Sequence, residues 1–231
     1  MTVLSAVQGA CPLMGLDVPT EVYGSLDPTM IEIQQVTNDV AEGIAKAYDW
    51  SLLHTLATYT GDGSTEDFSL PTDYSRMPKK AQLWSSSLET PLSPIPDIDR
   101  WLGLDVQSFD FVVNAWIIYG GQFHIKPALA SAVTAKHYYQ SNLIVQPEEG
   151  SNKMAFTVDT DIFRLDERLL KLGIVSRWRE IKGLPYAEEM DRFEDLKSKL
   201  MSEDKGSRII RVGRVRRPRG TNEAYPQSIT P

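Results

Sequence analysis

The sequence predicts an α+β fold in which a four-helix bundle carries a β-rich, sandwich-like module inserted between its second and third helices, followed by an extended C-terminal tail. Apolar residues recur at steps of three and four near both ends of the 231-residue chain, which is the helical period. Between these regions, short β-prone runs alternate with Gly, Pro, Asp and Ser, as is typical of strands and turns. We therefore expect residues 1–50 and 160–205 to form the bundle, residues 51–159 the β module, and residues 206–231 an extended basic tail.

Two helices are expected before the β module. In the first, apolar positions from Val3 to Met14 share one face and Gly15 ends the helix, while Pro12 is expected to loosen its second half. The second helix has a stronger start signal, because Asp27 is a favourable N-cap residue and Pro28 suits the first helical position. Its apolar stripe consists of Ile33, Val36, Val40, Ile44 and Ala47.

The β module is expected to contain about six or seven strands, enough for a small sandwich or a curled sheet. Its clearest part is a hairpin in which residues 115–119 and 122–126 flank Gly120-Gly121, since glycine supplies the positive φ that a tight turn needs. A second hairpin is expected around residues 61–63. Further strands are expected at residues 81–85 and 133–141.

Two more helices are expected after the β module. Asp159 or Asp161 is expected to cap the third helix, which ends at Gly183. Pro185 begins the fourth, and Gly206 ends it. The stripe of the third helix contains Leu165, Leu169, Leu172, Ile174, Trp178 and Ile181, and that of the fourth Tyr186, Met190, Phe193, Leu196 and Leu200. Because each stripe must be buried, the simplest arrangement packs all four helices together.

Charge is distributed unevenly along the chain. The formal net charge is −7, which argues against a protein whose whole surface coats nucleic acid or an anionic membrane. Residues 205–219 contain seven Lys or Arg and no acidic residue, whereas residues 1–204 contain 17 basic and 30 acidic residues. The chain is therefore an acidic body of −13 joined to an arm of +7.

The C-terminal arm has three interpretations. The first is a solvated extension without a single role. The second is a nucleic-acid arm that binds phosphates without sequence preference, and the third is a protein-docking arm. Its β-branched residues favour docking, because they suit a strand added to the edge of a partner's sheet and add little to phosphate binding. The docking residues predicted on this basis are Arg208, Ile209, Ile210, Arg211, Val212, Arg214, Val215, Arg216, Arg217 and Arg219.

We expect no catalytic residues, no cofactor and no metal site. The chain lacks a nucleophile elbow, a phosphate-binding glycine loop and metal-ligand spacing around its three histidines. A hydrolase built on His124 or His137 with nearby carboxylates remains an alternative. The single cysteine, Cys11, excludes an intramolecular disulfide framework and fits a reducing cytosol, and we expect neither a signal peptide nor a membrane span.

Several stretches, taken in order, resemble the head-to-tail adaptor proteins of tailed bacteriophages, also called connector or tail tubular protein A-like proteins. They are Asp27-Pro28-Thr29, AKAYDW at residues 45–50, TGDG at 60–63, FSLPTDYSRM at 68–77, Leu83-Trp84, LDERLLKLG at 165–173 and WREIKGLPYAE at 178–188. None is a catalytic signature, so the resemblance rests on their number and order. It extends over roughly residues 1–204.

This resemblance implies a structural virion protein that is not an enzyme. It implies a ring, dodecameric in the virion, that joins the portal to the tail and lines the DNA passage. The implied partners are other copies of the chain, the portal protein, and the tail tube, nozzle or other tail proteins; DNA passes without specific contacts and no membrane is involved. The implied place is the virion neck, after synthesis in the host cytoplasm. The alternative is a DNA-binding accessory protein that acts through its basic C-terminal arm.

Overall fold

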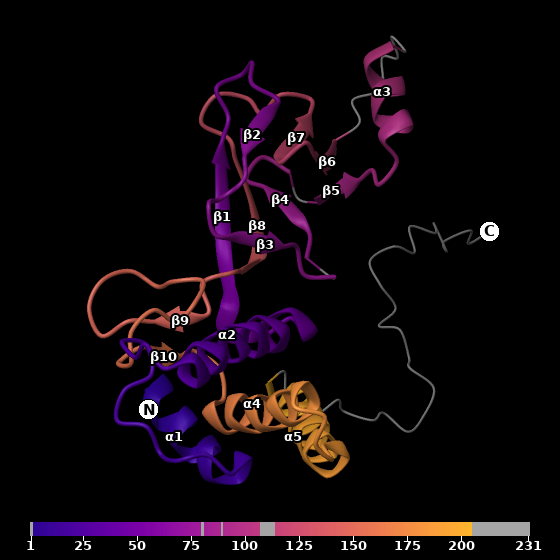
Figure 1. The fold of residues 1–231 in the computed structure, drawn as a ribbon. Coiled ribbons are helices and arrows are strands. Elements are labelled where there is room, and N and C mark those ends of the chain that lie inside the picture. Colours follow the sequence, from indigo (N-terminus) through magenta and orange to yellow (C-terminus); the bar gives the residue numbers. More distant parts are fainter. Residues whose placement is uncertain (1, 80, 89, 107–113, 205–231) are drawn as a thin grey trace, which may run out of the picture.

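The computed structural model describes residues 2–79, 81–88, 90–106 and 114–204. A layer of helices forms one end of the molecule, and a large sheet rises from it (Figure 1). The bulk of the buried apolar residues falls into one cluster among the helices and a second inside the sheet. The expected tail, residues 206–231, lies outside the described residues, and the division of the chain at residues 50/51 and 159/160 stays a prediction.

The helical layer contains four helices whose ends follow local capping signals. The helix α1 (Val3–Met14) continues through Pro12 and ends at Gly15, whose φ is 77°. In α2 (Pro28–Ala47), the predicted N-cap Asp27 accepts a hydrogen bond from Thr29 N at 3.0 Å. The cap of α4 (Glu167–Ile181) is Asp166, and neither Asp159 nor Asp161 caps it as predicted. The last helix is α5 (Ala187–Asp204).

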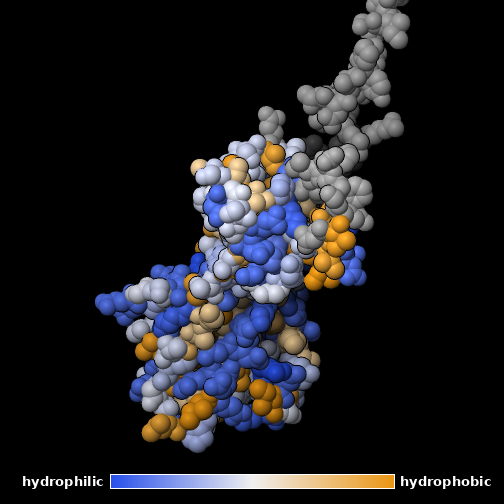
Figure 2. All heavy atoms as spheres, turned by 90° about the horizontal axis from the view of Figure 1, so that it is seen from above, coloured by the Kyte–Doolittle hydropathy of each residue, from blue (hydrophilic) through white to orange (hydrophobic). Residues whose placement is uncertain are grey.

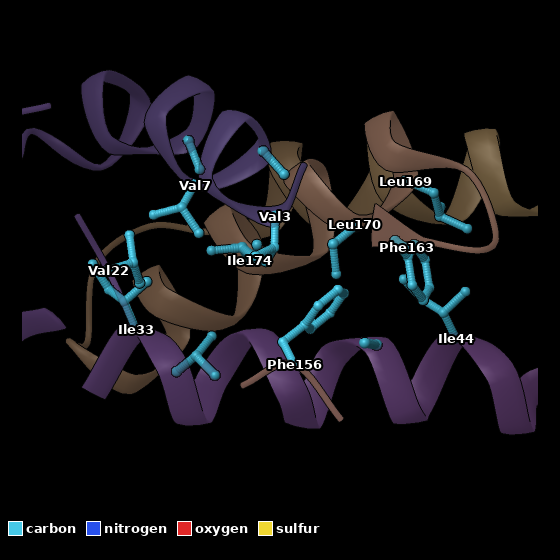
Figure 3. Close-up of a cluster of buried hydrophobic side chains, with 14 of the residues drawn as sticks. Val3, Val7, Val22, Ile33, Ile44, Phe156, Phe163, Leu169, Leu170 and Ile174 are labelled. Atoms are coloured by element: carbon cyan, nitrogen blue, oxygen red, sulfur yellow. The ribbon is translucent and has the colours of Figure 1, made fainter. Parts of the chain in front are cut away.

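These helices do not form the predicted four-helix bundle. Each of α1, α2 and α5 packs against α4, and α5 has no fully buried residue. The core is completed by segments outside the helices, which contribute Val22, Trp50, Leu53, Ile144, Val145, Phe156 and Phe163. Figure 3 shows Phe156 and Phe163 pointing into the space between α2 and α4. The prediction was wrong because it assumed that helical stripes bury only one another, whereas aromatic residues outside the helices fill part of this core.

The β-rich part is a mixed, nearly closed sheet of eight strands, so the predicted sandwich-like module is also wrong. The strand order is β1-β8-β4-β5-β6-β7-β2, and β3 pairs with β8 off this path. The strands are β1 (His54–Thr60), β2 (Asp67–Ser69), β3 (Tyr74–Arg76), β4 (Leu83–Ser85), β5 (Pro91–Pro94), β6 (Ala115–Tyr119), β7 (Gln122–Lys126) and β8 (Thr134–Ser141). A separate two-stranded sheet joins β9 (Val145–Gln146) to β10 (Ile162–Phe163), beside the helices.

The two predicted hairpins have different outcomes. The turn at Gly120 and Gly121 is confirmed, with φ of 58° and 76° between the antiparallel strands β6 and β7. The hairpin around residues 61–63 is wrong, because β1 pairs with β8 and β2 pairs with β7. Local turn residues therefore predicted a change of direction but not the partner of each strand.

A fifth helix, α3 (Ile98–Val106), lies inside the β-rich part and was not predicted. It connects β5 to β6, which are parallel. Parallel neighbours need a long crossover connection, and α3 supplies it. Trp101 packs from this helix against Ile95, Ala115 and Ile117, forming a small separate cluster.

Candidate interaction surfaces

The predicted docking residues, Arg208 to Arg219, all lie outside the described residues, and Asp204 is the last described residue before them. The carboxylate of Asp204, the last residue of α5, accepts hydrogen bonds from Ser51 N at 2.9 Å and Ser51 Oγ at 2.7 Å. Ser51 begins a short 3-10 turn, Ser51–Leu53, directly before β1. Asp204, after which the C-terminal segment begins, therefore lies at the foot of β1.

A shallow hollow of about 420 Å³ surrounds this root. One wall includes the exposed Leu52, and Arg164 Nη2 donates to Leu52 O at 3.0 Å. The other lining residues are Trp50, Leu165, Asp166, Leu200, Glu203 and Asp204. Three carboxylates and several apolar side chains thus meet where a basic, β-branched segment begins.

A first apolar surface lies where α1 and α4 end and α2 and α5 begin. Its exposed side chains are Leu13, Leu26, Ile31, Ile181, Leu184 and Tyr186, of which Leu26 is 90% exposed. Arg179 stabilises this surface. It donates hydrogen bonds to Leu13 O at 2.9 Å and Pro185 O at 3.2 Å, and it forms a salt bridge with Glu189 at 3.2 Å. We call these six residues the helix-end surface.

A second apolar surface lies on α3. Ile98, Leu102 and Val106 follow one another at steps of four, and they are 55%, 59% and 77% exposed. The buried Trp101 lies on a different face of the helix. Figure 2 shows hydrophobic side chains gathered beside the grey residues at the right-hand edge, the side on which α3 lies in Figure 1. The step of four was visible in the sequence, but α3 lies within a region interpreted as strands and turns.

His137 does not occupy a polar site. It is 1% exposed, neither of its ring nitrogens has a hydrogen-bond partner, and its ring stacks on Tyr59 and Phe123 at centroid distances of 5.6 and 5.0 Å. Burial lowers the pKa of His137 from 6.5 to about 4. Its imidazole therefore serves as a neutral ring of the sheet core.

The His124 ring is positioned by contacts at both of its nitrogens and by stacking. Its Nδ1 lies 2.6 Å from Asp67 Oδ1 and its Nε2 lies 3.3 Å from Tyr119 O, while its ring stacks on Tyr119. Both nitrogens thus face protein acceptors. Among the residues that the structure describes, neither His124 nor His137 has the arrangement of nucleophile and base that the hydrolase alternative requires.

The acidic residues before α4 fasten the loops of the helical layer. Asp159 accepts hydrogen bonds from Val22 N at 3.0 Å and Tyr23 N at 2.9 Å. The fully buried Asp161 accepts from Thr157 N at 2.8 Å and pairs with Lys153 Nζ at 2.8 Å. Burial opposes the charge of Asp161, but hydrogen bonds from Lys153 and two backbone amides outweigh burial and lower its pKa.

Neither a metal-binding cluster nor a membrane-spanning helix is found among the residues that the structure describes. No group of three or more His, Cys, Asp or Glu side chains there is arranged to hold a metal ion. No helix in the same ranges combines the length and the apolar character that crossing a membrane requires.

A family model described as "SU10 adaptor protein" matches residues 1–220, nearly the whole chain. The chain belongs to the SU10 adaptor protein family. No curated protein matches it. As a member of this phage head-to-tail adaptor family, the chain is a structural phage protein and a component of the virion, and it interacts with other head or tail proteins. The match includes the basic segment up to Arg219, although the resemblance in the sequence extended only to about residue 204.

Proposed function

We propose that this protein forms a ring in the virion neck that joins the portal to the tail and surrounds the DNA passage, without catalysing a reaction. The observation that carries the proposal is the family match over residues 1–220. Its partners are then other copies of the chain in a closed ring, the portal protein on one side, and tail tube or nozzle proteins on the other.

The two apolar surfaces support a role in assembly. A subunit of a cyclic ring contacts two neighbours through two different surfaces. Large exposed apolar patches are uncommon on proteins that act alone. The helix-end surface and the α3 surface lie on separate parts of the molecule, the first in the helical layer and the second at the tip of the sheet (Figure 1).

The charge distribution supports different roles for the acidic body and the basic arm. Residues 1–204 carry −13, so a lumen lined by acidic side chains would repel passing DNA. The arm of +7 contains Ile209, Ile210, Val212 and Val215 and suits docking on the portal or on a neighbouring subunit. Many such arms in one ring would make individually weak contacts effectively irreversible.

Mixing the purified protein with portal rings tests this function. We expect the full chain to bind the portal, and a chain that ends at Gly206 to bind much more weakly. Ring formation is scored separately by electron microscopy. A truncated chain that binds as well as the full chain would refute docking through the arm.

Two full-length variants separate docking from DNA binding. One replaces Ile209, Ile210, Val212 and Val215 with Ser and keeps every charge; the other replaces Arg211, Arg214, Arg216 and Arg217 with Gln. Docking predicts that the first variant loses portal binding. The alternative DNA-binding function predicts that only the second loses affinity, and that DNA binding of the natural chain falls steeply with salt.

A further inference from the structure

The outermost strand β1 has an edge that is not blocked. Among the residues that the structure describes, β1 pairs with β8 alone, in an uninterrupted register of seven residue pairs from His54↔Gln140 to Thr60↔Thr134. Proteins normally protect such edges with charged residues, Pro, a bulge or a very short strand. Residues 54–60 read HTLATYT and contain none of the residues that protect an edge. The opposite edge strand, β2, has only three residues and begins with Asp67.

The side chains of β1 leave this edge accessible. Ala57 and Tyr59 are buried in the sheet core, as expected for inward positions. Leu56, Thr58 and Thr60 face outward and are exposed, with Leu56 48% exposed. We define the open edge as the backbone side of Thr55–Thr60 that faces away from β8. An added strand would pair with this backbone and cover Leu56.

The C-terminal segment begins beside the open edge. Asp204 is hydrogen-bonded to Ser51, three positions before the first residue of β1. Residues 205–207 span up to about 10 Å when extended, which is about twice the 4.8 Å spacing between paired strands. Seven residues from Arg208 onward then match the seven residues of β1. Because both stretches start at the foot of the sheet, they would run parallel.

The chemistry of residues 208–215 fits this position. Ile209, Ile210, Val212 and Val215 have side chains that favour a strand. Arg208, Arg211 and Arg214 would leave positive charges on the new outer strand, and such charges are what blocks the addition of further strands. The body that receives this segment carries the opposite net charge.

We propose that residues 208–215 add to the open edge of β1 in the same chain, as a parallel ninth strand of the sheet. This inference goes beyond the adaptor function and needs no ring or portal. It has a consequence for that function, since the arm would be held on its own body until a partner competes for it.

Disulfide trapping in the full chain tests the pairing. In a Cys11→Ala background, Thr58→Cys is combined in turn with Ile210→Cys, Val212→Cys and Arg214→Cys, which samples registers two residues apart. The matched control replaces Thr58→Cys with Lys136→Cys. Lys136 is the direct partner of Thr58 on β8, exposed like it, and therefore at the same height but one strand further from the open edge. That places it about 10 Å from an added strand, beyond the roughly 7 Å limit for a disulfide.

We expect an intramolecular disulfide from Thr58→Cys with one of the three partners, and none from Lys136→Cys with any of them. Equal cross-linking of the two sites, or no cross-linking of either, would overturn the proposal. A disulfide that joins two chains would place the segment on another copy and would overturn the same-chain assignment.

Amide hydrogen exchange in the full chain gives a second readout. Val212→Pro removes a backbone donor from the proposed strand, and Asn222→Pro makes the same change outside it. In Val212→Pro, we expect the β1 amides that do not bond to β8 to exchange about five- to tenfold faster than in the natural chain, because about one net hydrogen bond is lost. In Asn222→Pro, we expect their exchange to be unchanged. Unchanged exchange in Val212→Pro would refute the added strand.

Discussion

Gly173 marks the place where three helices meet, and its replacement tests the arrangement of the helical layer. It is buried in the middle of α4. A Cβ atom added there would lie 2.5 Å from Val40 Cγ1 of α2 and 3.1 Å from Phe193 Cε2 of α5. Ordinary contacts between carbon atoms are about 3.5–4.0 Å, so Gly173→Ala forces α2 or Val40 to move. Val40 is β-branched and restricted in a helix, which leaves it little room to turn away.

The expected magnitude follows from two opposing effects. Replacing Gly by Ala inside a helix stabilises it by about 1 kcal/mol. Inserting a methyl group into a filled core costs about 1–3 kcal/mol. Gly43 of α2 supplies the matched control, because it is also inside a helix but nothing lies within 4 Å of an added Cβ. We therefore expect Gly43→Ala to raise the free energy of unfolding by about 1 kcal/mol, and Gly173→Ala to be about 1–3 kcal/mol less stable than Gly43→Ala.

Denaturant titration of the natural chain and the two variants measures these free energies. For a chain of this length, each kcal/mol corresponds to roughly 2–4 °C in Tm. In the double variant Gly173→Ala/Val40→Ala, the loss should be smaller than the sum of the two single losses, because the obstructing methyl group is gone. If Gly173→Ala stabilises the chain as much as Gly43→Ala, the close approach of α2 and α5 to α4 is wrong.

Two further predictions concern buried polar groups. Because the folded chain holds the pKa of His137 near 4 and the unfolded chain has the ordinary 6.5, the unfolded state binds this proton first as the pH falls. The contribution of His137 to the free energy of unfolding should therefore be fully present above pH 6.5 and fall by up to about 3 kcal/mol toward pH 4 in denaturant titrations, and His137→Phe should flatten this dependence. Asp161→Ala leaves Lys153 and two backbone amides without their carboxylate, so it should lower the free energy of unfolding by about 3 kcal/mol. Asp27→Ala, which removes only an exposed cap, should cost about 1 kcal/mol, and equal losses would contradict the buried role of Asp161.

Local signals predicted the individual helices better than their assembly. The capping residue Asp27 and the end of α1 at Gly15 lie where the sequence predicted them, because each depends on contacts within a few residues. The third helix was expected to begin at Asp159 or Asp161, yet those carboxylates bind distant loops and Asp166 is the cap. From the sequence alone, an aspartate before a helix is equally compatible with capping that helix and with binding a distant loop. Only the packing of the neighbouring loops distinguishes these two roles.

The candidate interaction surfaces likewise combine features that are visible in the sequence with features that only the structure reveals. The basic segment and its β-branched residues are apparent in the sequence. The exposed face of α3 was not predicted, because the stretch with a helical apolar pattern is short and lies among turn-forming residues. The tie between Asp204 and Ser51 joins positions 153 residues apart, so no local pattern reveals it.

The sequence by itself determined which segments are helical at the two ends of the chain, the Gly120-Gly121 hairpin, the separation of an acidic body from a basic arm, and the kinship to phage head-to-tail adaptors. Only the tertiary structure decided that β1 pairs with β8, that β5 and β6 are parallel with α3 as their crossover, and that α4 is the centre of the helical layer. The physical reason is that caps and turns are satisfied by neighbours in sequence. The choice of strand partner and helix neighbour depends instead on which surfaces exclude water together, and many pairings are compatible with the same local pattern.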